Sequence, residues 1–276
     1  LVMPNWEYLK KLLLFAWPLL FSSIANITNE LADRFMIDRL SENATYDVGI
    51  YSANYKLGIF MLLAVTGFKF AWQPYFINQA NRFNNGDSEL FAQVGTYYLM
   101  IASYILIVFS FNIELVAPYI MQREEYLVGL TIVPVVLIAY LIHGLGQLQI
   151  PGIYFKNKSS VLPWIHGSTA LVNVSLNYFL IKHFGWEGAA FATLISYIFY
   201  IVLQNIIVSR FFIIRWEFEK IFKIFMIVII LFAGFYFFDS VVFNLISIIL
   251  FPFSLIVFRL ISFKDLMKII YLERSS

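Results

Sequence analysis

Eight long apolar segments dominate this sequence and limit what it can fold into. They run over residues 12–31, 48–75, 94–121, 127–149, 161–181, 188–209, 221–238 and 241–260. A helix of about 20 mostly apolar residues is long enough to cross the roughly 30 Å hydrocarbon core of a bilayer. The run at 224–238 shows none of the strict alternation of membrane β-strands. The sequence therefore predicts an all-α integral membrane protein with eight transmembrane helices.

The composition agrees with this prediction. Of the 276 residues, 61% are hydrophobic and only 13% are charged. A soluble domain has about 45–50% apolar and about 25% charged residues. These values exclude a soluble enzyme, a nucleic-acid-binding protein and a disordered chain. The absence of cysteine excludes disulfides and thiolate metal sites, and it fits a protein of the bacterial inner membrane.

The positions of the basic residues predict how the helices are oriented. Of the 19 Lys and Arg residues, thirteen lie at one set of segment ends and four at the other, while Lys56 and Lys69 fall inside a segment. Cytoplasmic loops carry the excess of basic residues in membrane proteins. Both ends of this chain are therefore expected in the cytoplasm, in agreement with the even number of segments.

Polar residues form one face of the first segment. Ser22, Asn26, Asn29, Glu30 and Asp33 follow one another at offsets of 4, 3, 1 and 3, which places them on one side of a helix. A polar face of this kind is expected to point toward other helices or water and not toward the lipid tails. Two interpretations remain open. Either the face lines a hydrated cavity with a titratable acidic pair, or it joins helices, with Asp33 paired to a nearby arginine.

The two lysines of the second segment are also unusual for a membrane helix. Lys56 and Lys69 are 13 residues apart, roughly 20 Å along a helix axis. Lys69 shares a face with Thr66 and Gln73 and is followed by Pro74, which is expected to end or kink the helix. Two cations in one span suit an anionic group such as phosphate, whereas snorkelling toward the headgroups is the alternative.

Three later segments carry rows of uncharged polar residues at helical spacing. The rows are Tyr140, His143 and Gln147; His166, Thr169, Asn173 and Asn177; and Thr193, Tyr197, Tyr200 and Gln204. One such row is typical of hydrogen bonding between helices, but together the rows favour a hydrated cleft. The last two segments lack polar rows, since the only charge between Lys223 and Arg259 is Asp239. They are expected to be peripheral helices.

No catalytic constellation is recognisable in the sequence. His143, His166 and His183 have no acidic partner at metal-ligand spacing, and neither a glycine-rich phosphate loop nor a serine elbow occurs. No cofactor and no metal site are expected. The sequence favours a transporter over an enzyme.

Several motifs point to a family. They are FAWPLL at 15–20, NELADR at 29–34, VGIYSANYKL at 48–57, FKFAWQP at 68–74 and GWEGAAFAT at 185–193. Together they resemble the second half of Wzx-type oligosaccharide flippases, polysaccharide biosynthesis proteins of the multidrug/oligosaccharidyl-lipid/polysaccharide exporter superfamily. The small residues of the last motif allow close approach of neighbouring helices.

The resemblance implies how the chain is organised. Members of this family have two six-helix lobes around a central cleft, followed by two further helices. Residues 1–212 are expected to be the second lobe, 213–262 the two peripheral helices and 263–276 a cytoplasmic tail. The N-terminal lobe is missing from this chain, which opens Leu1-Val2. It is therefore expected to be a fragment or to work with a separate first-lobe chain.

The resemblance also implies a substrate, an oligosaccharide linked to polyprenyl diphosphate and flipped across the inner membrane for polysaccharide or lipopolysaccharide synthesis. Lys56 and Lys69 are expected to attract the diphosphate, and Arg34 to act near the outer mouth. Glu30 and Asp33 are expected to bind a proton or cation. The residues expected to contact sugars are Asn26, Asn29, Asn173 and Asn177. Membrane lipids are further partners. The alternatives are a multidrug or cation antiporter of the same superfamily and a membrane-embedded polysaccharide-assembly enzyme.

Overall fold

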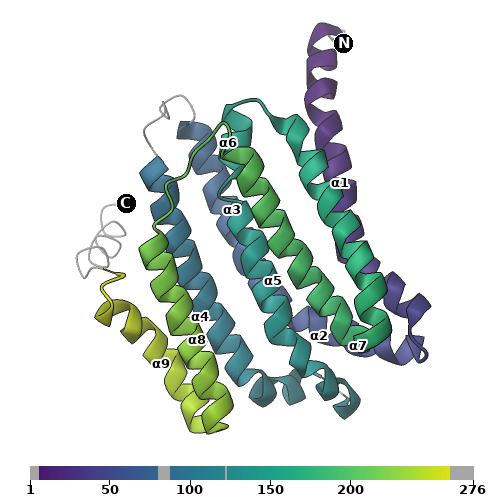
Figure 1. The fold of residues 1–276 in the computed structure, drawn as a ribbon, viewed down its shortest axis with the longest axis vertical. Coiled ribbons are helices and arrows are strands. Elements are labelled where there is room, and N and C mark those ends of the chain that lie inside the picture. The colour runs from purple at the N-terminus through teal and green to yellow at the C-terminus, as the bar shows by residue number, and fades with distance from the viewer. Residues whose placement is uncertain (1–5, 80–87, 122, 262–276) are drawn as a thin grey trace, which may run out of the picture.

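The computed structural model describes residues 6–79, 88–121 and 123–261 (Figure 1). The expected tail at 263–276 lies outside these ranges. Most of the described residues lie in helices: α1 (Trp6–Leu40), α2 (Ala44–Leu57), α3 (Ile59–Gln79), α4 (Ser88–Ile120), the 3-10 helix η1 (Glu124–Thr131), α5 (Ile132–Gly146), α6 (Ile150–Phe155), the 3-10 helix η2 (Ser159–Val161), α7 (Leu162–Val208), α8 (Phe218–Phe238) and α9 (Val241–Val257).

The helices account for all eight predicted segments. Four stretches of the described chain are helical, long and apolar enough to cross a membrane, or five if the bent pair α2–α3 is one span. Of these, α7 has 47 residues and reverses its direction at Gly185, so it supplies two of the predicted segments. The 35-residue α1 is long enough but carries the polar face, and α9 is an apolar helix of 17 residues. The all-α prediction with eight segments is confirmed.

The segment predicted at 48–75 is bent rather than straight. It consists of α2 and α3, which meet at Gly58 with an angle of 44°. A Cβ atom at Gly58 would lie 2.3 Å from Cγ1 of Val136, so only glycine lets α5 pack this closely against the bend. Pro74, expected to end or kink the helix, lies inside α3.

The reversal of α7 depends on two glycines. Gly185 has φ 58° and ψ −141°, a backbone conformation that strains any residue with a side chain. After this turn the second arm of α7 returns along the first, and a Cβ atom at Gly188 would lie 2.3 Å from the backbone oxygen of Leu180. Ala189 and Ala190 are fully buried at the same crossing. Small residues therefore hold the two arms in close contact.

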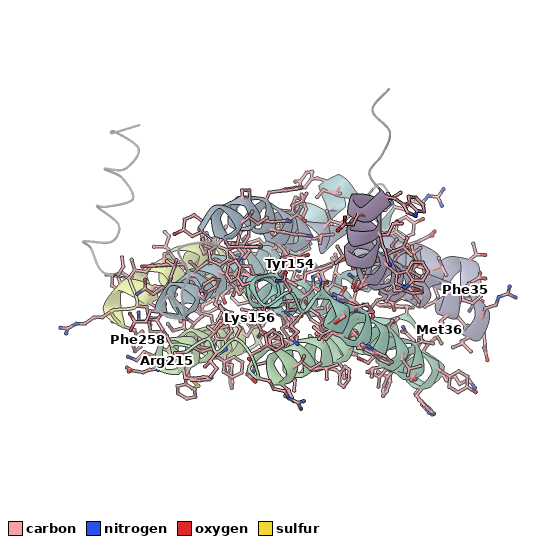
Figure 2. The ribbon with its side chains drawn as sticks, turned by 90° about the horizontal axis from the view of Figure 1, so that it is seen from above. Phe35, Met36, Tyr154, Lys156, Arg215 and Phe258 are labelled. Carbon is pink, nitrogen blue, oxygen red and sulfur yellow. The ribbon has the colours of Figure 1, made fainter. Side chains whose placement is uncertain are left out.

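The peripheral pair α8 and α9 packs on α4 and on each other. Phe111 of α4 is buried and stacks on Phe235 of α8 with ring centroids 4.6 Å apart, and Phe251 of α9 is fully buried in the same cluster. This pair lies on the opposite side of the molecule from α1 (Figure 1). In the view from above, Phe35 and Met36 of α1 lie near one edge of the molecule, and Phe258 at the end of α9 lies near the opposite edge (Figure 2).

The start of α8 is tied to α4 by a polar contact. The Thr96 hydroxyl donates to Oε2 of Glu217 at 2.6 Å, and Nζ of Lys220 donates to Oε1 at 2.6 Å. Burial acts to raise the pKa of the Glu217 carboxyl, but the Lys220 and Thr96 donors hold it below its ordinary value. The contact thus places a charged group where the connection from α7 ends.

Replacing Gly188 with alanine is expected to destabilise the α7 hairpin. The new methyl group meets backbone atoms that cannot turn aside, and overpacking of this kind costs about 1–3 kcal/mol. Gly167→Ala is the matched control, because a Cβ atom there meets nothing within 4 Å. Thermal unfolding in detergent should give a lower midpoint for Gly188→Ala and an unchanged or slightly higher one for Gly167→Ala. Equal midpoints would contradict the packing described.

Candidate functional site

Asp33 occupies the centre of the site. Its side chain is completely buried, at 0% exposure. The Tyr51 and Thr193 hydroxyls donate to Oδ2 at 2.5 and 2.6 Å, and the Asn177 amide donates to Oδ1 at 2.7 Å. These donors come from α2 and from both arms of α7. They offset the cost of removing a carboxyl group from water.

Glu30 lies one helical turn from Asp33 and has its own ring of hydroxyls. The Tyr197 hydroxyl donates to Oε1 at 2.9 Å, and the Tyr140 hydroxyl donates to Oε2 at 3.0 Å. The Tyr55 hydroxyl lies 3.4 Å from Oε2 and 3.0 Å from the Tyr140 hydroxyl. Phenol groups from α2, α5 and α7 therefore converge on one acidic side chain of α1.

These two acidic residues and their six donors are named the carboxylate cage. Its members are Glu30, Asp33, Tyr51, Tyr55, Tyr140, Asn177, Thr193 and Tyr197. The tyrosines of the cage belong to the largest cluster of buried apolar side chains. The polar groups of the cage are thus surrounded by the apolar side chains of the main core.

Arg34 lies beside the cage without donating to its carboxylates. One guanidinium nitrogen donates to the backbone oxygen of Glu30 at 2.8 Å, and Cζ lies 4.9 Å from the centroid of the Tyr55 ring and 5.8 Å from that of Tyr51. Cations are attracted to aromatic faces at such distances. The donors of Asp33 are therefore neutral groups, and the arginine pairing that one interpretation of the sequence assigned to it is not formed.

The predicted asparagines are divided between two places. Asn29, Asn173 and Asn177 are buried, and the Asn177 amide also donates to Oδ1 of Asn173 at 3.0 Å. Within the described chain, Oδ1 of Asn29 and Oδ1 of Asn177 are buried without a hydrogen-bond partner. Asn26 is exposed and lines a separate cavity. Asn177 is thus part of the cage and Asn173 is bonded to it, whereas Asn29 is buried next to Glu30 in the chain and Asn26 lies at the other cavity.

The second polar region is a cavity of about 330 Å³ between α1, α3, α5, α6 and α7. Lys69 lines it together with residues of all these helices, and we name it the lysine cavity. Its polar walls include Ser22, Asn26, Lys69, Trp72, His143 and Tyr200. No Asp or Glu of the described chain is among its lining residues. Its volume lies at the lower end of the range of about 300–1,000 Å³ that is usual for small-molecule sites.

Lys56 lies apart from this cavity. It is exposed in the last turn of α2, next to the bend at Gly58, and is not among the lining residues. The structure thus brings Lys69 together with Asn26 but not with Lys56. The two lysines lie on two helices that meet at an angle, whereas a single straight span was expected.

The tyrosines of the cage were not predicted as site residues. Tyr140 and Tyr197 belonged to polar rows at helical spacing, but nothing in the sequence showed that both rows meet Glu30. Tyr51 and Tyr55 are four residues apart on α2 and follow the same pattern. A search for tyrosines at this spacing, and not only for amides and charges, would have found them.

A metal centre is not indicated by the described residues, which contain no group of three or more His, Asp or Glu side chains placed to hold an ion.

Comparison with known proteins gives a fold relationship. No protein-family model and no curated protein matches the chain. Among solved structures, the chain is similar to the outward-facing conformation of a multidrug resistance MATE family transporter of the MOP superfamily, with a TM-score of 0.58 and 17% identity over 79% of this chain. The chain spans about half of that protein, 51% of its length. It therefore has the fold of the corresponding part of a MATE transporter.

Removing one donor from Asp33 is expected to destabilise the protein. Thr193→Val keeps the side-chain shape but leaves the carboxyl group with two donors, and the loss of one partner of a buried polar group costs about 1–3 kcal/mol. Thr169→Val is the matched control, because this buried hydroxyl donates only within its own helix, to the Ile165 backbone oxygen at 2.8 Å. Thermal unfolding should show the larger loss for Thr193→Val. Similar losses would mean that the bond to Asp33 contributes little.

Proposed function

We propose that this chain is one lobe of a membrane transporter. The observation that carries the proposal is a polar interior within an apolar helical bundle, formed by the carboxylate cage and the lysine cavity. Ionisable side chains inside membrane segments are costly and usually mark a solute or ion pathway. The fold shared with a MATE transporter supports the same conclusion. Since the chain spans 51% of that protein, a first lobe is needed to complete the pathway.

The substrate proposed is an oligosaccharide linked to polyprenyl diphosphate, flipped across the bacterial inner membrane for polysaccharide synthesis. Lys69 supports this choice because it brings a cation to a cavity whose described lining contains no Asp or Glu, and Asn26 offers an amide to sugar hydroxyls beside it. In this proposal Lys56 and Arg34 assist the diphosphate on other parts of its path. The distribution of the basic residues supports a cytoplasmic location for both ends of the chain in this proposal.

Glu30 and Asp33 are proposed as the proton- or cation-coupling residues. Hard cations prefer oxygen ligands, and the cage offers carboxylate and phenol oxygens. Two further oxygens, Oδ1 of Asn29 and Oδ1 of Asn177, have no described hydrogen-bond partner. Asn173 supports Asn177 through their shared hydrogen bond. Loading of the cage would alternate with rocking of two lobes about the pathway.

A multidrug or cation antiporter is the second candidate. It is favoured by the tyrosines around Glu30, since aromatic and acidic groups attract organic cations, and by the multidrug transporter to which the fold is similar. The two candidates differ at the lysine cavity, because Lys69 repels a cationic drug and attracts a diphosphate.

Deletion of the gene separates these candidates. For the flippase, complete lipid-linked oligosaccharides should accumulate on the cytoplasmic face of the membrane, and surface polysaccharide should be lost. The measurement is the amount of lipid-linked oligosaccharide accessible on each face. Unchanged pools with increased drug sensitivity would instead establish the antiporter.

Glu30→Gln is expected to uncouple export from the ion gradient. The amide keeps an oxygen for the tyrosine hydroxyls but cannot bind a proton or compensate a cation, so export should fall at least tenfold and lose its response to an uncoupler. Asp38→Asn is the control, because Asp38 lies on the same helix but is exposed. The readout is surface polysaccharide at equal protein level. If both variants export normally, the coupling role of Glu30 is wrong.

A further inference from the structure

We infer that the lysine cavity is a binding site for a phosphate-class oxyanion, held by Lys69, Trp72, His143 and Ser22. The inference deepens the proposed function. It rests on that function only where it names the source of the phosphate. It adds that this chain contains a complete anion site of its own, so that binding does not require the first lobe.

The hydrogen-bonding capacity of the cavity indicates the charge of the ligand. The Lys69 ammonium has three donors and no acceptor, and the Trp72 indole nitrogen is a donor only. A ligand that satisfies both must be rich in acceptor oxygens. No carboxylate lines the described cavity to neutralise Lys69. A compact oxyanion meets these requirements, whereas a cation or an apolar ligand does not.

Three polar atoms of the cavity residues lack partners. Nε1 of Trp72, Nδ1 of His143 and Oγ of Ser22 are buried with no hydrogen-bond partner in the described chain. They come from α3, α5 and α1, and these three residues line the same cavity. Buried polar groups are paired in nearly all native structures, so each exception calls for an explanation. Because their residues line the cavity, side-chain rotations that turn these atoms toward a bound ligand would give them partners.

The aromatic groups of the cavity are held in place by packing. The Trp72 ring lies 5.3 Å from that of Phe91. The His143 ring lies 4.8 Å from that of Tyr197 and 5.5 Å from that of Tyr200. Donors fixed in this way lose little conformational freedom when a ligand binds. The site is therefore preorganised for a rigid anion.

The size of the cavity limits what enters it. A volume of about 330 Å³ accommodates a small polar group, while a full oligosaccharide must remain outside. Helix α6 lines the site through Ile150 and Tyr154, and Tyr154 lies near the middle of the molecule in the view from above (Figure 2). The expected ligand is thus phosphate or diphosphate, free or as the headgroup of a lipid.

Titration of the purified chain in detergent with inorganic diphosphate tests the inference. Calorimetry should show saturable binding, weakened at least tenfold by Lys69→Met and several-fold by Trp72→Phe, which keeps an aromatic ring but removes the donor. Two controls should bind as the unsubstituted chain does. They are Lys182→Met, a lysine that is exposed like Lys69 but lies outside the cavity, and Trp164→Phe, a tryptophan that is 80% exposed. Thermal unfolding verifies that each variant is folded.

Absence of saturable binding, or equal weakening by Lys182→Met and Lys69→Met, would overturn the inference. Farnesyl diphosphate in the same micelles identifies the origin of the anion. At least tenfold tighter binding than inorganic diphosphate indicates a lipid headgroup, and equal binding indicates free phosphate; both support the site. The chain could bind diphosphate while deletion of its gene leaves the amounts of lipid-linked oligosaccharide unchanged. That combination would reject the proposed substrate but would still support the anion site.

Discussion

A carboxyl group buried inside a helical bundle needs hydrogen-bond donors from the helices around it. The packing of α1, α2 and α7 meets this need for Asp33. Its three donors come from α2 and from the two arms of α7. Asn177 and Thr193 lie on opposite sides of the Gly185 turn, so the hairpin is what brings both to one carboxyl group. The position of α1 is therefore defined by polar contacts as much as by apolar packing.

The two polar regions have opposite chemistry. In the carboxylate cage, hydroxyl and amide groups of the protein donate to the carboxyl oxygens of Glu30 and Asp33. In the lysine cavity, the ammonium of Lys69 and the indole of Trp72 are donors that face no carboxylate of the described chain. One region thus finds the partners of its acidic side chains within the protein, while the other depends on acceptors from outside.

Much of this arrangement could be predicted from the sequence, because hydropathy and helical periodicity are local properties. The apolar segments, the polar face that carries Glu30 and Asp33, and the helical character of each segment follow from them. The bend at Gly58 could not be predicted, since it depends on the approach of Val136 from a distant helix. The same holds for the tyrosine donors of Glu30, whose meeting requires three helices to pack together. Lys56 and Lys69 were expected from the sequence to attract the same diphosphate, and only the packing shows that Lys69 lines the cavity and Lys56 does not.

The continuity of α1 has a mechanical consequence. Ser22 at the lysine cavity and Asp33 in the cage lie on the same rigid rod, 11 residues apart, which is about 16 Å along the axis. A rotation of this rod that withdrew Asp33 from its donors would also turn Ser22 away from the cavity wall. The part of α1 that lines the lysine cavity therefore cannot move independently of the part that lies in the carboxylate cage. The helix itself transmits a movement from one region to the other, and no chain of contacts between them is needed.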